Sequence, residues 1–407
     1  MVNNVQNIQK LLNKFNLKLW IMVNTNNSDR VFCKYISKNL ATSSMCFISL
    51  DKVYLLINEL DKDNVDHKHL KINNIQVVYY TSSKDLERKI EDIISYMGFL
   101  SPISLSYTTM GDQNTDILGH GEFITLKKIF KAPYLKYKKK ITFNSAEKII
   151  YSLLGKKTDT QIERIKSVSR ITNEILETSF KTMRVGMSEI EIAKHIVDVT
   201  KKITAKYISK DVVAYSLAWE NCPIVLTGEN LVKGGHSLPS DKKLLKGDTI
   251  YVDFGICATY SDEEKIYSDM QRMGYALKKN ELKPPKNVQN IFKTLNSSIE
   301  AALDYMKPDV KGYVIDEIVR NNIIRAGYPS YNHSTGHPVG LDVHDTGAIL
   351  SFRTSKRARL GLLENGVYTL EPRIATINGG SIEEMILVTK FGGIPVCKMQ
   401  KDIYLVK

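Results

Sequence analysis

Acidic residues embedded in apolar segments are the feature of this sequence that most restricts its fold. Four segments of the C-terminal half have the apolar, β-branched and aromatic character of buried strands, yet each contains a carboxylate; they are residues 249–255, 267–272, 367–372 and 381–389. Burying a carboxylate is costly unless it is paired or binds a metal ion. One such acid could be an exposed strand residue, but the repetition predicts that these acids meet at a common site.

A fifth segment, residues 333–345, adds histidines to this set. It contains His333, His337 and His344, three of the eight histidines in the chain. Their clustering in a glycine-containing segment favours a functional role over a structural one.

Together the five segments supply a set of candidate metal ligands. Its members are Asp253, Asp269, His337, Glu371 and Glu383. Carboxylates can bridge metal ions, so four of them with one imidazole suit two adjacent divalent ions better than a single zinc ion. Ligation that is rich in oxygen favours Mn²⁺ or Co²⁺, with Zn²⁺ or Fe²⁺ as alternatives.

At these residues the chain resembles the aminopeptidase P and prolidase branch of the pita-bread metallopeptidases. The motifs that carry the resemblance are V-D-F-G at 252–255, S-D-x-x-R at 268–272, G-H-x-V-G-L-D-V-H-D at 336–345, T-x-E-P at 369–372 and I-E-E-x-x-L-V-T at 382–389. The resemblance implies an α+β fold with two domains. A pita-bread catalytic domain, with helices outside a curved antiparallel sheet, is expected at 156–407, and a smaller α/β creatinase-like domain at 1–155.

The resemblance also implies roles for individual residues. The five candidate ligands would hold the metal pair, and Glu371 would in addition act as general base and proton shuttle. His344 would stabilise the tetrahedral oxyanion or the leaving nitrogen. His236, in the G-G-H-S stretch before the first ligand, would contact substrate and take part in catalysis, and His333 would flank a proline pocket.

Two ligand positions have a rival nearby in the sequence. Asp262 also follows a Tyr-Ser pair, but Asp269 is preferred because Arg272 follows it at the spacing of the family. Glu384 is the alternative to Glu383. A shift of one residue along a strand turns the side chain to the other face, so only one of these two glutamates can point at the site.

Recognition of the end of the substrate is where the chain departs from the family pattern. Ser381 stands where many relatives have arginine, and Arg373 stands where glycine is common. Arg357 or Arg359 is an alternative partner for a substrate carboxylate, which would favour dipeptides, although an exposed basic loop is also consistent with this stretch.

Apolar periodicity divides the rest of the chain into elements. Helical spacing is found at 4–17, 84–98, 157–182, 286–306 and 311–326, and strand-like runs at 17–23, 45–59, 75–80 and 103–107. Thr158 offers a helix cap, and Ser188 with Glu191 reads as a capping box. The domain boundary is therefore placed just before the helix at 157–182.

Composition restricts partners and compartment. The five cysteines are scattered and include no C-x-x-C pair, which disfavours a disulfide framework or a structural zinc site. The net charge is +13, but the lysines are spread along the chain and no nucleic-acid-binding motif accompanies them. No secretory signal and no apolar run long enough to span a membrane is visible. A cytoplasmic protein that binds neither nucleic acid nor membrane is expected, and the resemblance implies a homodimer.

The sequence thus predicts an exopeptidase that hydrolyses the N-terminal Xaa-Pro bond of peptides with a dinuclear metal centre. The alternatives are a catalytically inactive binding module on the same fold and a dipeptide-restricted prolidase with relaxed proline specificity. A metal-free amidinohydrolase like creatinase is disfavoured because all five ligand positions are filled. A methionine aminopeptidase is also disfavoured, because the long N-terminal domain and the residues around His333 resemble prolidase and aminopeptidase P more closely.

Overall fold

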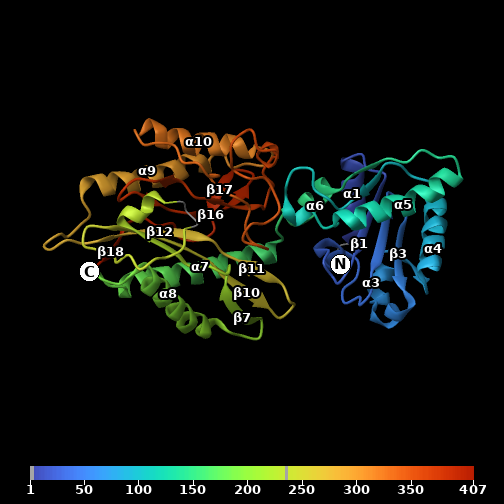
Figure 1. Ribbon diagram of the computed structural model, residues 1–407, viewed down its shortest axis with the longest axis horizontal. Helices are drawn as coiled ribbons and strands as arrows, with labels where there is room; N and C mark the ends of the chain where they lie inside the picture. The colour runs from blue at the N-terminus through green and yellow to red at the C-terminus, as the bar shows by residue number, and fades with distance from the viewer. Residues whose placement is uncertain (1–3, 234–236) are drawn as a thin grey trace. The chain divides into compact units, whose positions relative to one another are not determined.

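A computed structural model describes residues 4–233 and 237–407 of the chain (Figure 1). The chain forms two compact units, Met1–Leu154 and Gly155–Lys407. The boundary expected from the sequence lay one residue further along.

The N-terminal unit is a mixed six-stranded sheet in the order β4-β3-β2-β1-β5-β6. Strand β2 pairs antiparallel with β1 and β3, and the remaining neighbours are parallel. The strands are β1 Leu19–Asn24, β2 Ser44–Ser49, β3 Val53–Asn58, β4 Gln76–Tyr80, β5 Ile103–Leu105 and β6 Phe143–Ser145. The helices are α1 Asn4–Lys14, α2 Arg30–Tyr35, α3 His67–Ile72, α4 Ser83–Tyr96, α5 His120–Lys136 and α6 Glu147–Leu154.

Both faces of this sheet are covered, which explains the unbroken apolar run in β1. Trp20 and Met22 point into one core, which contains residues of α1, α2 and α6. Leu19, Ile21 and Val23 point into the other core, with residues of α4 and α5. A strand buried on both faces has no polar side to alternate with, so its sequence reads as continuously hydrophobic.

The C-terminal unit places two pairs of helices on opposite sides of its strands (Figure 1). The helices are α7 Asp159–Thr182, α8 Glu189–Thr204, α9 Lys286–Leu303 and α10 Gly312–Arg325. The strands are β7 Val212–Leu217, β8 Ile224–Thr227, β9 Thr249–Phe254, β10 Ile256–Tyr260, β11 Lys265–Tyr267, β12 Met270–Ala276, β13 Val367–Leu370, β14 Arg373–Ile374, β15 Gly380–Ser381, β16 Glu384–Thr389, β17 Gly392–Pro395 and β18 Tyr404–Val406.

Among residues 155–233 and 237–407, the strands form four small sheets. Their orders are β11-β10-β7, β18-β12-β9-β8, β13-β16-β17 and β14-β15. Every pairing is antiparallel except that of β12 with β18. One core packs α7 and α8 against β9 and β10, and a second packs α9 and α10 against β12, β13 and β16. The strands that carry the candidate ligands therefore lie between the two helical layers.

The long helix α7 begins and packs as its sequence predicts. Thr158 and Gln161 form a reciprocal capping box at its start, and Ser188 and Glu191 do the same for α8. Each box satisfies backbone N–H groups that have no partner within the helix. Within residues 4–233 and 237–407, no helix is both long and apolar enough to cross a membrane.

Candidate metal centre

Two antiparallel strands, β9 and β12, bring the first two candidate acids together. Asp253 lies in β9 directly opposite Gln271 of β12, and Asp269 immediately precedes β12. Gly255 makes the close approach of these segments feasible, because a Cβ atom there would lie 2.1 Å from the carbonyl oxygen of Ser268. A side chain at this position would push the segment before Asp269 away from β9.

The histidine segment runs alongside β13 and aligns His337 with Glu371. The Thr369 N–H donates to the His337 carbonyl at 2.8 Å, and the Glu371 N–H donates to the Thr335 carbonyl at 2.8 Å. Gly336 is needed here, since a Cβ atom would lie 2.0 Å from the Thr369 carbonyl oxygen. Backbone pairing thus fixes the imidazole and the carboxylate on adjacent segments.

The last candidate ligand is placed by β12 as well. Glu383 lies between β15 and β16, and its N–H donates to the Gln271 carbonyl at 3.1 Å. All five candidate ligands therefore lie in or next to β9, β12 and β13, or in segments that are hydrogen-bonded to these strands. More than a hundred residues separate the first ligand from the last along the chain.

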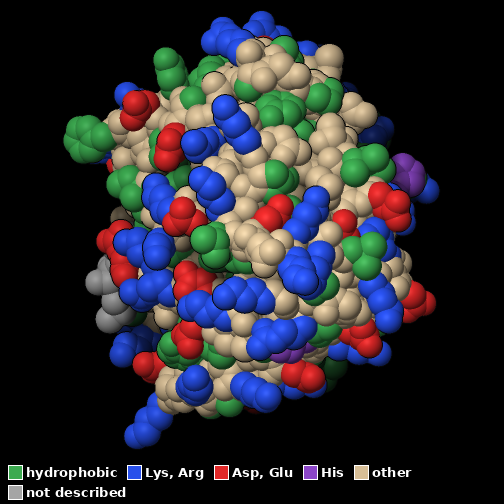
Figure 2. Space-filling view, turned by 90° about the vertical axis from the view of Figure 1, so that its left-hand side faces the viewer, with side chains coloured by type: hydrophobic (Ala, Val, Ile, Leu, Met, Phe, Trp, Pro, Cys, Tyr) green, Lys and Arg blue, Asp and Glu red, His purple; other side chains and the backbone are tan. Residues whose placement is uncertain are grey.

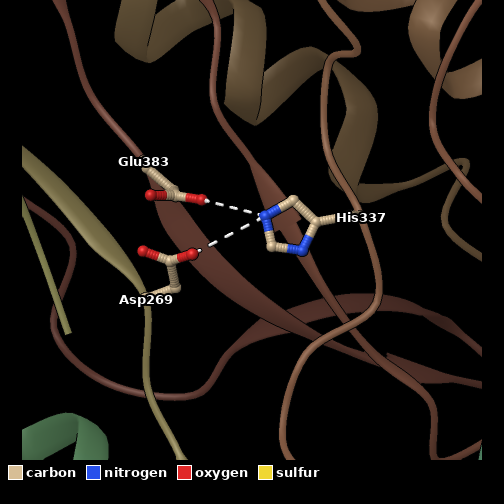
Figure 3. Close-up of side chains that lie close together, drawn as sticks. All are labelled: Asp269, His337 and Glu383. Carbon is tan, nitrogen blue, oxygen red and sulfur yellow. Dashed lines mark ion pairs between the residues drawn. The ribbon is translucent and has the colours of Figure 1, made fainter. Parts of the chain in front are cut away.

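The imidazole of His337 lies close to three of the carboxylates, and Figure 3 shows two of them, those of Asp269 and Glu383. Its Nε2 lies 3.6 Å from Asp269 Oδ2, 3.8 Å from Glu371 Oε1 and 3.9 Å from Glu383 Oε1. On the other side of the ring, Nδ1 donates to the Pro338 carbonyl oxygen at 3.1 Å. This hydrogen bond leaves the lone pair of Nε2 directed at the acids, as in a metal-ligating histidine.

Gln271 and Tyr251 organise the other half of the cluster. The Gln271 Nε2 donates to Glu371 Oε2 at 3.2 Å and to Asp253 Oδ2 at 3.4 Å. The Tyr251 hydroxyl also donates to Asp253 Oδ2, at 2.9 Å. One oxygen of Glu371 therefore faces His337 while the other shares a donor with Asp253, so Glu371 lies between the two halves.

Burial and mutual repulsion shift the protonation equilibria of these groups. Burial, together with the negative charges of neighbouring acids, raises the pKa of Asp269 and of Glu383 well above the usual range. Burial, followed by the charge of Asp253, raises the pKa of Glu371 to about 8. Burial lowers the pKa of His337 to about 3. Without a cation, the site thus favours neutral side chains.

Unsatisfied oxygen atoms indicate what the cluster can hold. Asp269 Oδ1 and both Oε1 and Oε2 of Glu383 are buried without a hydrogen-bond partner. A buried polar atom of this kind costs free energy unless a partner is supplied. Carboxylate oxygens and one imidazole nitrogen are suitable ligands for divalent ions, and atoms of Asp269, His337 and Glu383 lie within 4.8 Å of one another. The residues fit a metal site.

Comparison with known proteins agrees with this donor set. Residues 163–390, more than half of the 407 residues, match metallopeptidase family M24. The chain belongs to metallopeptidase family M24. It is 28% identical over 255 residues to an uncharacterized peptidase of Staphylococcus saprophyticus, covering 62% of this chain and 65% of that relative. It is 27% identical over 264 residues to the Xaa-Pro dipeptidase of Pyrococcus horikoshii, covering 64% of this chain and 68% of that enzyme.

The fold agrees over the whole chain. The crystal structure of the X-Pro aminopeptidase from Thermotoga maritima superposes with a TM-score of 0.66 at 22% identity, covering 98% of this chain and 99% of that one. The expected two-domain architecture with a pita-bread fold is confirmed. In this M24 chain, the family fold thus surrounds the cluster of acids described above.

Two further histidines lie near the cluster or on the segment that leads to it. The ring of His344 is exposed and lies 4.4 Å from that of His337, at an interplanar angle of 82°. His333 packs its ring at 4.7 Å from that of Tyr331, and its Nδ1 lies 2.8 Å from the Ser334 carbonyl oxygen. His236 lies outside the described residues.

The arginines considered for substrate binding contact backbone carbonyl groups. Arg357 donates from Nε to the Gly347 carbonyl at 3.0 Å and from Nη2 to the Asp345 carbonyl at 3.2 Å. Arg359 is exposed and donates to the Arg353 carbonyl at 2.9 Å. Arg357 therefore borders the segment that contains His344.

The two rival acids lie away from the cluster and have partners of their own. Asp262 is exposed, and its Oδ2 lies 3.0 Å from Arg164 Nη1. Glu384 is buried, and its Oε1 lies 3.2 Å from Arg272 Nη1. The strand register explains the second case, because neighbouring residues at the start of β16 point to opposite faces.

Sequence reasoning missed the polar residues that hold the ligands. Gln271 and Tyr251 contact carboxylates of the cluster, and the Thr369 hydroxyl accepts the backbone N–H of His337 at 3.1 Å. Each lies two positions from a candidate ligand and so on the same face of its strand, which is the signal that could have identified it.

Proposed function

We propose that this chain is an exopeptidase with two divalent metal ions that hydrolyses the N-terminal Xaa-Pro bond of peptides. The single observation that carries the proposal is the group of buried, unsatisfied oxygen atoms on Asp269 and Glu383 next to the free nitrogen of His337. Its M24 relatives include a protein named Xaa-Pro dipeptidase, and its fold is that of a protein named X-Pro aminopeptidase. These names support the substrate class.

The metal ligands in this proposal are the five residues of the cluster. They are Asp253, Asp269, His337, Glu371 and Glu383. Mn²⁺ or Co²⁺ suits this oxygen-rich set best. When bound, such ions would polarise the substrate carbonyl and lower the pKa of the attacking water. Two ions rather than one are favoured because Oε1 of Glu371 lies 3.8 Å from His337 Nε2 while its Oε2 shares the Gln271 donor with Asp253, so this carboxylate could serve as a ligand to both ions.

Glu371 is proposed to move the proton. Its side chain is 18% exposed, whereas that of Glu383 is 1% exposed. A general base must reach the proton that it abstracts, so Glu371 can meet water and substrate while Glu383 can act only as a ligand. Glu371 would accept a proton from the attacking water and deliver it to the leaving nitrogen.

The exposed imidazole of His344 is proposed to stabilise the reaction centre. It lies beside His337 and is accessible to a bound peptide. A hydrogen bond from this ring to the developing oxyanion or the leaving nitrogen would lower the barrier. His333, His236 and Arg357 are the remaining proposed substrate contacts. The proposal includes both dipeptides and longer peptides as substrates.

Peptide hydrolysis tests the proposal. Metal-stripped protein is assayed on Ala-Pro and Ala-Pro-Ala with and without Mn²⁺, alongside Glu383→Gln and the matched control Asp262→Asn, with folding checked by circular dichroism. Cleavage that needs metal, is lost in Glu383→Gln and persists in Asp262→Asn is expected. The preferred peptide separates the dipeptidase from the aminopeptidase. A folded protein inactive with Mn²⁺, Co²⁺ and Zn²⁺ would point to a binding module.

A further inference from the structure

A buried ion pair lies outside the proposed set of ligands and catalytic residues. The Nζ of Lys157 lies 3.0 Å from Asp345 Oδ2, and the two side chains are 0% and 1% exposed. Removing two charges from water costs about as much as their attraction returns, so a buried pair contributes little net stability. Such a pair more readily serves to fix a particular local geometry.

Asp345 organises the segment that carries His344. Its Oδ2 accepts the N–H of Leu341 at 2.8 Å, and its Oδ1 accepts the N–H of Thr346 at 2.7 Å. Its own N–H donates to the Pro338 carbonyl at 2.8 Å. One carboxylate thus ties both ends of the short segment around His344 and anchors it near the backbone that follows His337.

Lys157 is itself held firmly. Its backbone N–H donates to the Asn365 carbonyl at 3.0 Å, and its Nζ donates to the Gly155 carbonyl at 3.2 Å. A Cβ atom at Gly340 would lie 3.1 Å from the lysine Cε and 2.8 Å from Ile165 Cδ1. The backbone of the histidine segment therefore passes directly over the lysine stem, and the ammonium group has a single defined position.

We propose that Lys157 and Asp345 are positioning residues that hold the imidazole of His344 in place beside His337. His344 is exposed, and its ring lies against that of His337 at 4.4 Å between ring centroids. The backbone that carries this ring is anchored by the Asp345 carboxylate and its ion pair with Lys157. Catalytic groups must be held within about 0.5 Å of their productive position to be effective.

The part of this inference that concerns catalysis rests on the proposed function, because it assumes that His344 acts on the substrate. Loosening the segment would then lower kcat by about 10- to 100-fold, as expected for the loss of a supporting residue. KM and the affinity for Mn²⁺ would change little, because neither partner of the ion pair is a proposed ligand.

The experiment compares Asp345→Asn and the double variant Lys157→Met/Asp345→Asn, each with and without His344→Ala. The double variant leaves no buried charge without its partner, so it remains folded even if Asp345→Asn is unstable. Arg164→Met is the matched control, since it removes the ion pairs of α7 with Asp262 and Glu264. Hydrogen exchange of the backbone at residues 339–347 is measured on the same proteins.

The expected result has two parts. Each ion-pair variant lowers kcat when His344 is present but changes it by less than about twofold when His344 is alanine. Exchange at residues 339–347 accelerates in the ion-pair variants and not in Arg164→Met. Equal losses of kcat in both backgrounds, or unchanged exchange, would overturn the inference. If the wild type cleaves no peptide, the proposed function fails, and the exchange data alone decide whether the ion pair holds the segment.

Discussion

At the scale of single residues, the centre depends on neutral side chains as well as on charged ones. The carboxamide of Gln271 donates to both Asp253 and Glu371, two acids that would otherwise repel each other. The backbone carbonyl group of Gln271 accepts a hydrogen bond from the backbone N–H of Glu383. Gln271 thus orients three candidate ligands without being one itself, in the way that outer residues commonly orient metal ligands.

Replacing Gln271 with methionine tests this arrangement. The variant keeps the length of the side chain but removes its hydrogen bonds to Asp253 and Glu371, together with the one that its Oε1 accepts from the Ser381 hydroxyl, so the affinity for Mn²⁺ should fall by about 10- to 100-fold. Isothermal titration calorimetry measures the Kd. Gln289→Met in α9, where the side chain donates only to the Pro284 carbonyl, should leave the Kd unchanged. An unaltered Kd in Gln271→Met would contradict the orienting role.

The sequence reveals the charged members of the site more readily than the neutral ones. A carboxylate such as Asp253 stands out because ionised groups are rarely buried in apolar strands without a partner. Gln271, Tyr251 and Thr369 do not stand out, because such residues are ordinary in strands. Their contacts depend on which strand lies opposite, and the pairing of Gln271 with Asp253 comes from the register of β9 and β12.

At the scale of elements, the approach of the histidine segment to β13 determines the site. The apolar character of residues 367–372 predicted the strand that becomes β13, but it cannot predict that residues 336–338 lie beside this strand, since that contact joins segments distant along the chain. Gly336 is the residue on which the approach depends. The choice between Glu383 and Glu384 was equally a matter of strand register, which the pairing of β13 with β16 determines.

Adding a methyl group at Gly336 should therefore destabilise the chain. The new Cβ would lie 2.0 Å from the Thr369 carbonyl oxygen, and the strands must separate to accept it. A loss of about 1–3 kcal/mol in the free energy of unfolding is expected, with weaker Mn²⁺ binding. Urea denaturation measures the free energy of unfolding. Gly121→Ala in α5 should be neutral or stabilising, because an added Cβ there would have no atom within 4 Å other than those of its chain neighbours and of the helix's own backbone. Equal stability of the two variants would refute the argument.

At the scale of the whole molecule, the folds of the two units were predicted from different features of the sequence. The alternation of helices and strands indicated the α/β character of the first unit, and the motifs indicated the fold of the second. The net charge of +13 was less informative about binding partners. Figure 2 shows lysine and arginine side chains spread over the face in view and interleaved with acidic ones, rather than forming one continuous patch.

The stability of the metal-free protein should depend on pH. Folding raises the pKa of Glu371 from 4.5 to about 8, so the folded state binds a proton more tightly than the unfolded state does. This contribution to stability is fully present below pH 4.5 and is lost as the pH rises through about 8. The lowered pKa of His337 acts in the opposite sense below pH 6.5, so the Tm from differential scanning fluorimetry should fall most clearly between about pH 6.5 and 8.

Two controls attribute this pH dependence to the cluster. Glu371→Gln should show a smaller decrease in Tm, because its side chain does not titrate. Added Mn²⁺ should raise the Tm most at the alkaline end, where the carboxylates are ionised and bind the cation. The same pH dependence of the Tm in the wild type and in Glu371→Gln would be inconsistent with the raised pKa of Glu371.

Whether the cluster of acids binds two metal ions can be determined by counting the ions bound per chain. Metal-stripped protein is equilibrated with Mn²⁺, and bound metal is measured by inductively coupled plasma mass spectrometry for the wild type, Glu383→Gln and Asp262→Asn. We expect two ions per chain in the wild type and in Asp262→Asn, and a loss of bound metal in Glu383→Gln. One ion or none in the folded wild type, or full occupancy in Glu383→Gln, would contradict this expectation.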